Sequence, residues 1–264
     1  MSYNVRGIGG ASKVTTLRRI IELKKPKIIA IQEAMTDGER AKEIMGAILK
    51  DWRMETIDAE GHSRGLLIAW SPEITFYAKS DYKDALGTEL EDPKTGIRFF
   101  FLNVYGPFYD RRIYWESLAN ERALDQENLI LVGDLNLTLS TTEVWGQNAR
   151  SDALANFFIS LFEQKKLISL QLICLEHTWK NNRTGDQEIS KRMDRFLISK
   201  EICQDHLVLK TAMETWGLSD HRPITLSVTI PEEKSPTPFK FNLVWRENED
   251  YREMVKRNWK PLEV

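Results

Sequence analysis

Short apolar runs alternate with amphipathic segments along most of the chain. Six of these runs are rich in β-branched and aromatic residues and about 4–9 residues long, which favours strands over buried helices. They are Lys27–Ile31, Leu66–Trp70, Ile97–Tyr105, Leu129–Val132, Met193–Ile198 and Pro223–Ile230. The acidic stretch Asp81–Asp92 is expected to form a solvated strand pair with its loop.

Helical periodicity separates several of these strands. Apolar residues recur at helical spacing over Val14–Ile21, with Ser12 as a candidate cap, and over Leu154–Phe162. A third helix is predicted over Arg111–Leu124. The connections vary too much in length for a repeated βαβ barrel. Two strand sets packed face to face, with helices outside, suit this mixture, so we predict an α/β sandwich.

The composition of the chain changes after Ile230. Pro231–Pro238 contains three prolines and is typical of a stiff linker. The residues beyond it are highly charged, and a helix is expected over about Asn248–Trp259. We therefore predict a folded domain of residues 1–230, followed over 231–264 by a proline-rich linker and a partly helical tail.

The overall composition is that of a globular protein. With 42% hydrophobic residues, the 264-residue chain can bury a large core. A net charge of -2 argues against a broad basic field, so contact with nucleic acid must be local or built around a metal ion. Two cysteines without a CxxC pair support neither a disulfide framework nor a cysteine-built zinc site. Without a membrane-length apolar run or a secretion signal, we expect an intracellular protein.

Polar side chains stand where several of the predicted strands end. Taken singly, a carboxylate or amide after a strand is more often a turn residue or a helix cap than a catalyst. A lone tyrosine or histidine there also has an ordinary structural explanation. The order and type of these residues, taken together, favour a functional site. Along the chain they are Asn4, Gln32, Glu33, Tyr105, Asp134, Asn136, Asp194, Asp220 and His221.

Six short motifs that contain these residues resemble, in order, the motif series of the endonuclease/exonuclease/phosphatase superfamily. They are Ser2-Tyr-Asn-Val-Arg-Gly7, Ile31-Gln-Glu33, Asn103-Val-Tyr-Gly-Pro107, Gly133-Asp-Leu-Asn136, Arg192-Met-Asp-Arg195 and Ser219-Asp-His221. One such motif alone is weak, but the ordered set over about residues 2–230 is specific. The resemblance implies a DNase I-like, four-layer α/β/β/α sandwich with two mixed β-sheets, and a hydrolase acting on phosphoric ester bonds.

A narrower resemblance is to the apurinic-type endonuclease domains of LINE-type non-LTR retrotransposons, particularly those of plants. It is carried by Arg64–Trp70, His177–Trp179 and Phe239–Trp245. In such elements a comparable tail leads into a reverse transcriptase, so the resemblance implies a reverse transcriptase domain as partner in the full-length element. We further expect DNA as the substrate, a nuclear location, no membrane partner and a monomeric enzyme.

The same resemblance implies which residues hold a metal ion. Glu33 would be the main ligand of Mg²⁺, or of Mn²⁺ in its place, with Asn4 beside it and Asp220 as a further contact. Mg²⁺ prefers oxygen ligands and keeps several waters, so one or two carboxylates suffice. The abasic-site enzymes of the superfamily carry an acidic residue where Arg6 stands. Arg6 therefore argues against a second strong metal position on that side.

The remaining residues are implied to act on water and phosphate. Asp134 would orient or deprotonate the attacking water, Asn136 would help to hold that water and the phosphate, and Tyr105 would hydrogen-bond the phosphate. His221 would stabilise the charged phosphate. Asp194 would favour the imidazolium and fix the orientation of its ring.

Contacts with the substrate are predicted around a polar loop. Lys180–Ile189 is typical of a hairpin loop, and a solvated turn is the alternative explanation. The resemblance implies that this loop contacts the DNA groove. Thr178, Arg183 and Arg64 are accordingly the predicted substrate-binding residues.

We therefore expect endonucleolytic nicking of DNA that leaves a 3′-hydroxyl able to prime reverse transcription. A phosphatase or ribonuclease of the same superfamily is one alternative, although Leu137–Ser140 and Lys191–Arg195 differ from the inositol phosphatase motifs. A decayed, non-catalytic remnant that binds nucleic acid is the second alternative. The intact polar set argues against it, because drift would have damaged at least one position.

Overall fold

The computed structural model describes residues 1–58, 65–173, 176–204, 207–230 and 248–258. The chain divides into two compact units, Met1–Ile230 and Pro231–Val264. The described part of the second unit is a helix, α5 (Glu249–Asn258), close to the helix expected there. Where an independently folding domain ends stays a prediction, and the candidate site lies wholly within the first unit.

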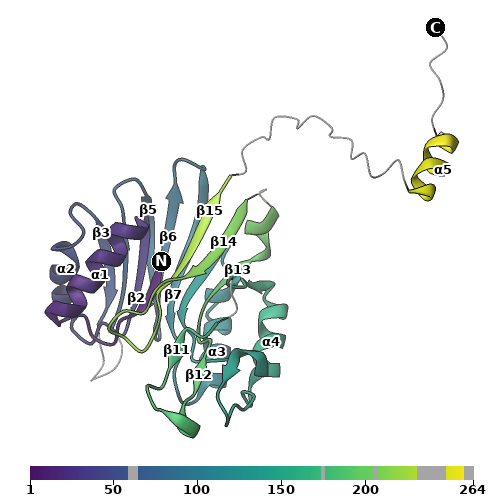
Figure 1. Ribbon diagram of the computed structural model, residues 1–264. Helices are drawn as coiled ribbons and strands as arrows, with labels where there is room; N and C mark the ends of the chain where they lie inside the picture. The colour runs from purple at the N-terminus through teal and green to yellow at the C-terminus, as the bar shows by residue number, and fades with distance from the viewer. Residues whose placement is uncertain (59–64, 174–175, 205–206, 231–247, 259–264) are drawn as a thin grey trace. The chain divides into compact units, whose positions relative to one another are not determined.

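Two six-stranded sheets form the centre of the first unit (Figure 1). The first has the order β14 (Val208–Met213), β15 (Ile224–Thr229), β1 (Ser2–Asn4), β2 (Ile28–Gln32), β4 (Leu66–Trp70) and β3 (Arg53–Ile57). The second has the order β10 (Leu167–Ser169), β13 (Asp194–Ser199), β8 (Leu129–Asp134), β7 (Ile97–Tyr105), β6 (Ala85–Asp92) and β5 (Thr75–Tyr82). Both are mixed, because β1 pairs with β2 and β7 with β8 in parallel.

A smaller sheet lies beside them. It consists of β11 (Trp179–Lys180), β12 (Ser190–Lys191) and β9 (Val144–Trp145). The first two of these strands form the hairpin that was expected around Lys180–Ile189, since the Asn181 N–H donates to the Ile189 carbonyl oxygen at 3.0 Å.

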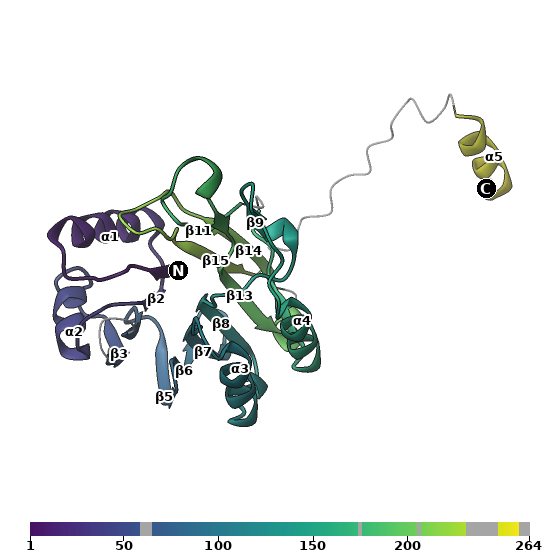
Figure 2. The same cartoon turned by 90° about the horizontal axis from the view of Figure 1, so that it is seen from below.

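Helices cover the outer faces of the two large sheets (Figures 1 and 2). α1 (Ala11–Lys24) and α2 (Gly38–Gly46) pack on the first sheet, and α3 (Arg111–Asn120) and α4 (Ala155–Gln164) on the second. This order confirms the predicted four-layer α/β/β/α sandwich. Short 3₁₀ helices occur at Ala123–Asp125, Thr141–Glu143, Gly185–Gln187 and Lys200–Gln204. Within the described ranges, no helix combines the length and the apolar character needed to cross a membrane.

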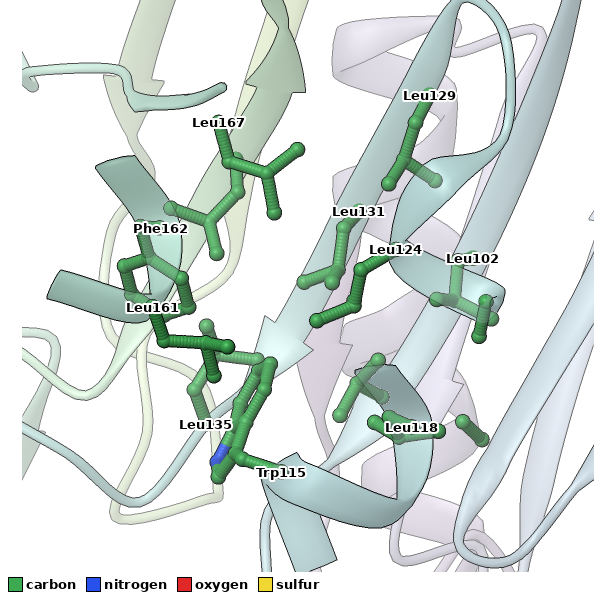
Figure 3. Close-up of a cluster of buried hydrophobic side chains, with 14 of the residues drawn as sticks. Leu102, Trp115, Leu118, Leu124, Leu129, Leu131, Leu135, Leu161, Phe162 and Leu167 are labelled. Carbon is green, nitrogen blue, oxygen red and sulfur yellow. The ribbon is translucent and has the colours of Figure 1, made fainter. Parts of the chain in front are cut away.

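Three hydrophobic clusters fill the spaces between the four layers. On β8, Leu129 and Leu131 pack toward the helices, whereas Ile130 and Val132 pack toward the first sheet. A strand that is buried on both faces is continuously apolar, which explains why the central strands were recognisable as unbroken runs. Figure 3 shows the cluster between the second sheet and α3 and α4, where the fully buried Trp115 lies among leucine side chains.

The structure differs from the sequence pattern in several places. The pattern does not predict α2, β3 or β14, which are short and, in the two strands, mostly half-buried or exposed. Two local expectations are wrong. α1 begins at Ala11, so Gly10 rather than Ser12 occupies its N-cap. Asp81–Asp92 is not simply solvated, because Leu86 and Leu90 on β6 pack between the sheets.

Candidate active site

The polar residues predicted at the strand ends meet because their strands are neighbours. Asn4 ends β1, and Glu33 directly follows β2, its parallel neighbour. In the second sheet, Asp134 of β8 is in register with both Tyr105 of β7 and Asp194 of β13. Because these strand ends lie at one edge of the sandwich, side chains from both sheets can form one hydrogen-bonded cluster.

Asn4 connects the two sheets within this cluster. Its Nδ2 donates to Oε1 of Glu33 and to Oδ2 of Asp134, both at 2.9 Å. The same nitrogen lies 3.5 Å from Nε2 of His221. All four side chains are buried. The buried amide therefore fixes the two carboxylates relative to each other.

His221 and Asp194 form a buried pair next to Asp134. Nδ1 of His221 lies 2.9 Å from Oδ2 of Asp194, and its Nε2 lies 3.5 Å from Oδ2 of Asp134. The loop that carries the imidazole is held to β1 by Ser219. The Ser219 hydroxyl donates to the Asn4 carbonyl oxygen at 2.7 Å and accepts the N–H of His221 at 3.1 Å. The imidazole is thus oriented through its ring and through its backbone.

Burial and neighbouring charges shift the pKa values of this cluster. Burial alone would lower the pKa of His221, but the carboxylates of Asp194 and Asp134 outweigh it and raise the pKa to about 9. Burial raises the pKa of Asp134 to about 7, against the opposing effect of His221. An imidazolium therefore lies beside a carboxyl group that changes charge near neutrality, and such groups suit proton transfer.

Arg6 pairs with two of the predicted metal-binding carboxylates. Its Nη1 donates to Oδ2 of Asp220, and its Nε lies 3.8 Å from Oε2 of Glu33. Oδ2 of Asp220 also accepts the indole N–H of Trp179 at 3.0 Å. One oxygen of Asp220 is therefore engaged by two protein donors, and a role for this carboxylate in metal binding stays a prediction.

The donor atoms around Glu33 fit a hard cation. A carboxylate with a neighbouring amide and a second carboxylate, at Asn4 and Asp134, is an oxygen-rich set of the kind that Mg²⁺ prefers. Asp134, Asp194 and His221 also bring ligand atoms within 4.8 Å of one another. In that trio the raised pKa of the imidazole favours a proton over a metal ion. Glu33 with Asn4 is therefore the better cation site.

A cavity of about 400 Å³ opens beside the cluster. Its wall includes Glu33, Tyr105, Asp134, Asn136 and His221. Four cationic side chains contribute to the same wall, namely Arg6, Arg111, Arg150 and Lys191. The cavity therefore offers local positive charge for an anionic group, although the chain as a whole has a net charge of -2.

Asn136 and Tyr105 occupy the positions expected of phosphate-binding residues. Asn136 is in the left-handed region with φ 50, and its Nδ2 donates to the Gly106 carbonyl oxygen at 2.7 Å. Its N–H donates to Oδ1 of Asp134 at 3.1 Å. Burial and the charge of Glu33 raise the pKa of Tyr105 above its usual range, so its hydroxyl keeps the proton that it can donate to an anion.

The predicted substrate-binding residues are not brought together in this cluster. Thr178 is fully buried, and its hydroxyl accepts the N–H groups of Met193 and Asp194, both at 3.0 Å. Its position corrects the expectation of a substrate contact, because the side chain holds the start of β13 instead. Arg183 lies exposed in the β11–β12 hairpin, as expected of a groove contact. Arg64 lies outside the described residues.

Two buried polar clusters support the site, and the motif search does not assign them a role. Behind Glu33, Nε2 of Gln32 donates to Oδ1 of Asn103 at 2.5 Å and so joins the two sheets. Beside Asp194, the carboxylate of Glu143 binds the two flanking arginines, at 3.0 and 2.9 Å. Polar residues inside apolar runs were the signal for the first cluster. The second depends on Thr141–Glu143, which no pattern connects with β13.

The fold and the site together define the class of protein. A four-layer sandwich that gathers carboxylates, an amide and an Asp–His pair beside a positively charged cavity is suited to hydrolysis of phosphoric esters. Residues 1–221 match the model of the Endonuclease/Exonuclease/phosphatase family, and the chain belongs to this family. Its enzymes are generally dependent on a divalent metal, in agreement with the donor set at Glu33.

Solved structures of the same fold include nucleases and a phosphatase. The AP endonuclease LMAP from Leishmania major is 16% identical, with 85% of each chain covered and a TM-score of 0.67. The endonuclease domain of TRAS1, a telomere-specific non-LTR retrotransposon, is 18% identical over 88% of this chain and 98% of that one, with a TM-score of 0.63. The 3′ phosphatase NExo from Neisseria, bound to a product DNA hairpin, is 16% identical over 86% and 98%, with a TM-score of 0.63. No match was found among curated proteins.

Proposed function

We propose that this protein is a Mg²⁺-dependent endonuclease that nicks DNA. The observation that carries the proposal is the buried hydrogen-bonded chain from Glu33 through Asn4 and Asp134 to His221, which opens on a cavity with cationic walls. It places a cation-binding carboxylate, a proton acceptor and a cationic imidazole around one space. A phosphodiester is a substrate that uses all three.

Hydrolysis divides the work among these residues. A divalent ion held by Glu33 and Asn4 supplies charge stabilisation at the phosphate when it is bound. Asp134, with its pKa raised to about 7, accepts a proton from the attacking water. The imidazolium of His221 and the hydroxyl of Tyr105 hydrogen-bond the phosphoryl oxygens, where negative charge grows.

DNA is the substrate best supported among the phosphoric esters. The cavity is open and bordered by cations, and the adjacent β11–β12 hairpin projects an exposed Arg183. Nuclease domains, one from a retrotransposon, are among the structures of the same fold. A nick that leaves a 3′-hydroxyl would serve a reverse transcriptase as a primer. The net charge of -2 requires that the contact be local, which agrees with cations gathered around one cavity.

A phosphatase is the second candidate function. The 3′ phosphatase from Neisseria shares the fold, and the catalytic chain described here acts on phosphate whichever ester carries it. The candidates differ in what surrounds the phosphate. A phosphatase acts on a terminal phosphate, whereas an endonuclease needs a continuous strand across its cavity.

The test uses the purified chain, supercoiled plasmid and Mg²⁺, with and without EDTA. Conversion to open circles that requires the metal supports the proposal. Glu33→Ala should abolish nicking at ordinary Mg²⁺ concentrations while its unfolding temperature remains near that of the wild type. Intact plasmid, together with release of inorganic phosphate from a 3′-phosphorylated hairpin, would establish the phosphatase instead. Wild-type nicking by Glu33→Ala at saturating Mg²⁺ would remove Glu33 as the metal ligand.

A further inference from the structure

Two neighbouring aromatic side chains stand in solvent beside the active-site cavity. Phe108 is 73% exposed and Tyr109 is 82% exposed, in the segment between β7 and α3. Their rings meet edge to face, with centroids 6.0 Å apart and an interplanar angle of 62°. Leaving two adjacent aromatic rings in water is costly, because each forgoes the burial that such side chains usually gain. Their exposure is therefore better explained by a ligand than by the fold.

The position of Phe108 connects this pair with the reaction. Its side chain lines the same cavity as Tyr105, Asp134 and His221. A group that is covalently attached to a phosphate in this cavity must therefore pass close to the ring of Phe108.

Hydrogen bonds hold the segment on both sides. The Gly106 N–H donates to the Asp134 carbonyl oxygen at 2.8 Å, and its carbonyl oxygen accepts from the Asn136 side chain. A Cβ at Gly106 would lie 2.1 Å from the Leu135 carbonyl oxygen, so the close approach requires glycine. On the other side, Arg111 binds Asp152 with both terminal nitrogens, at 2.6 and 2.8 Å. The aromatic pair is thus presented on an anchored segment.

The chemistry of the neighbourhood indicates the ligand. A group that binds here must be flat and apolar enough to cover an aromatic ring, and must be joined to an anion that the cationic wall attracts. The cations of Arg150 and Lys191 line the cavity together with Phe108. A nucleotide has this combination, because each base is joined through one sugar to the phosphate. Every base has a π-face, so such a contact tolerates any sequence.

We propose that Phe108 stacks on the nucleobase next to the phosphate in the active site, with Tyr109 bracing its ring edge to face. This inference rests on the proposed function and deepens it, since it names the recognised substrate as a strand with an accessible base beside the cleaved bond. A base in a duplex must partly unstack to meet Phe108. Nicking should therefore favour steps that unstack readily, such as pyrimidine–purine steps.

The first experiment measures binding apart from cutting. A fluorescein-labelled duplex with a mapped nick site is titrated with protein in EDTA, and the dissociation constant is read from anisotropy. Phe108→Ala should raise it roughly 5- to 150-fold, the usual worth of one base–aromatic stack. Phe108→Trp should retain the affinity, whereas Phe108→Leu, which is apolar but has no π-face, should not.

Matched controls separate stacking from a general apolar contact. Ile113 is 67% exposed on the adjoining helix α3 but does not line the cavity, so Ile113→Ala should bind like the wild type. Tyr77 is 45% exposed on the edge strand β5, beneath Arg98, and Tyr77→Ala should also be neutral. If Phe108→Leu and Ile113→Ala change binding together with Phe108→Ala, the patch is an ordinary apolar surface, as for a protein partner, and the proposal is wrong.

The second experiment removes the base rather than the ring. Two oligonucleotides are made in which the nucleotide on one side or the other of the mapped phosphate keeps its sugar but lacks its base. For one of them the wild type should lose as much affinity as Phe108→Ala does on intact DNA, and Phe108→Ala should lose nothing further. Additive losses with both oligonucleotides would overturn the stacking assignment.

Failure of the proposed function gives a different result. If DNA is bound but never nicked, the endonuclease proposal fails, while the two binding experiments still decide whether Phe108 stacks on a base; they then use an arbitrary duplex with bases removed one at a time. If the wild type does not bind DNA at all, both proposals fail together.

Discussion

Asn4 donates hydrogen bonds to a carboxylate beside each sheet, at Glu33 and Asp134, so one fully buried amide sets the distance between cation site and proton acceptor. The sequence predicts the identity of these residues, since they follow recognisable strands in a specific order. It does not predict that Trp179 and Arg6 share one oxygen of Asp220. That contact depends on the paths of three loops, which no local pattern determines.

Asp194 should act through His221, and the pH profile of nicking tests this. The wild-type rate should rise as Asp134 loses its proton near its pKa of about 7 and fall as His221 loses its proton near its pKa of about 9. Asp194→Asn removes a charge that raises the pKa of His221, so the fall should move to lower pH. The measurement is the rate constant for plasmid nicking between these limits at saturating Mg²⁺.

Double substitution provides the control for that profile. His221→Ala should slow nicking by about 10²–10⁴, the usual worth of a positioned group in proton transfer, and Asp194→Asn should cost less because the imidazole remains. The double variant should be no slower than His221→Ala alone. Multiplying losses, or an alkaline limb that does not move in Asp194→Asn, would show that the carboxylate acts independently of the ring.

Arg6 should weaken metal binding, because its guanidinium lies 3.8 Å from Glu33 and pairs with Asp220. A fixed positive charge beside the cation site opposes a second cation. Arg6→Ala should therefore lower the Mg²⁺ concentration that gives half-maximal nicking, whatever it does to the maximal rate. Arg6→Lys, which retains the charge, is the matched control. An unchanged or higher Mg²⁺ requirement in Arg6→Ala would mean that Arg6 supports the metal site.

At the scale of elements, predictability follows burial. β4 is buried at every position and β8 likewise, so their apolar runs stand out in the sequence. β3 and β14 lie at opposite edges of the first sheet and are mostly half-buried or exposed, so their sequences carry no clear period. The four-layer order was predictable because central strands are the signal. The edges and the loops that complete the site depend on tertiary contacts.

The β11–β12 hairpin should determine where the enzyme nicks. Phosphate and metal contacts are the same at every nucleotide and carry no sequence information, so preference must come from elsewhere. Exposed Arg183 lies in this hairpin. Replacing Asn182–Glu188 with a short Gly-Ser turn should flatten the distribution of nick sites on a long duplex, read by primer extension.

A reporter without a groove is the control for this replacement. Cutting of an unstructured phosphodiester should change much less than the nick map does, because the catalytic cluster is untouched. The map should also lose its contrast in the single variant Arg183→Ala. A nick map that stays the same after the loop replacement would place sequence preference elsewhere, with the segment around Phe108 as the next candidate.

At the scale of the whole molecule, the charge balance agrees with a local substrate contact. The net charge of -2 provides no long-range attraction for DNA, while Arg6, Arg111, Arg150 and Lys191 gather at one cavity. The composition predicts the first fact and cannot predict the second. Clustering of cations is a property of the fold, because these residues come from separate elements and loops.

Removing the chain beyond Ile230 should leave an active enzyme. The family match ends at residue 221, and among the described residues the buried members of the three hydrophobic clusters all lie between Met1 and Ile224. No catalytic candidate lies beyond His221. A protein of residues 1–230 should therefore nick plasmid at a rate within about twofold of the full chain and unfold at a similar temperature, since changes away from packed contacts usually have small effects. Calorimetry and the plasmid assay measure both. A truncated chain that aggregates, or that folds but nicks slowly, would show that residues 231–264 contribute to the domain, and the predicted boundary at 230 would be wrong.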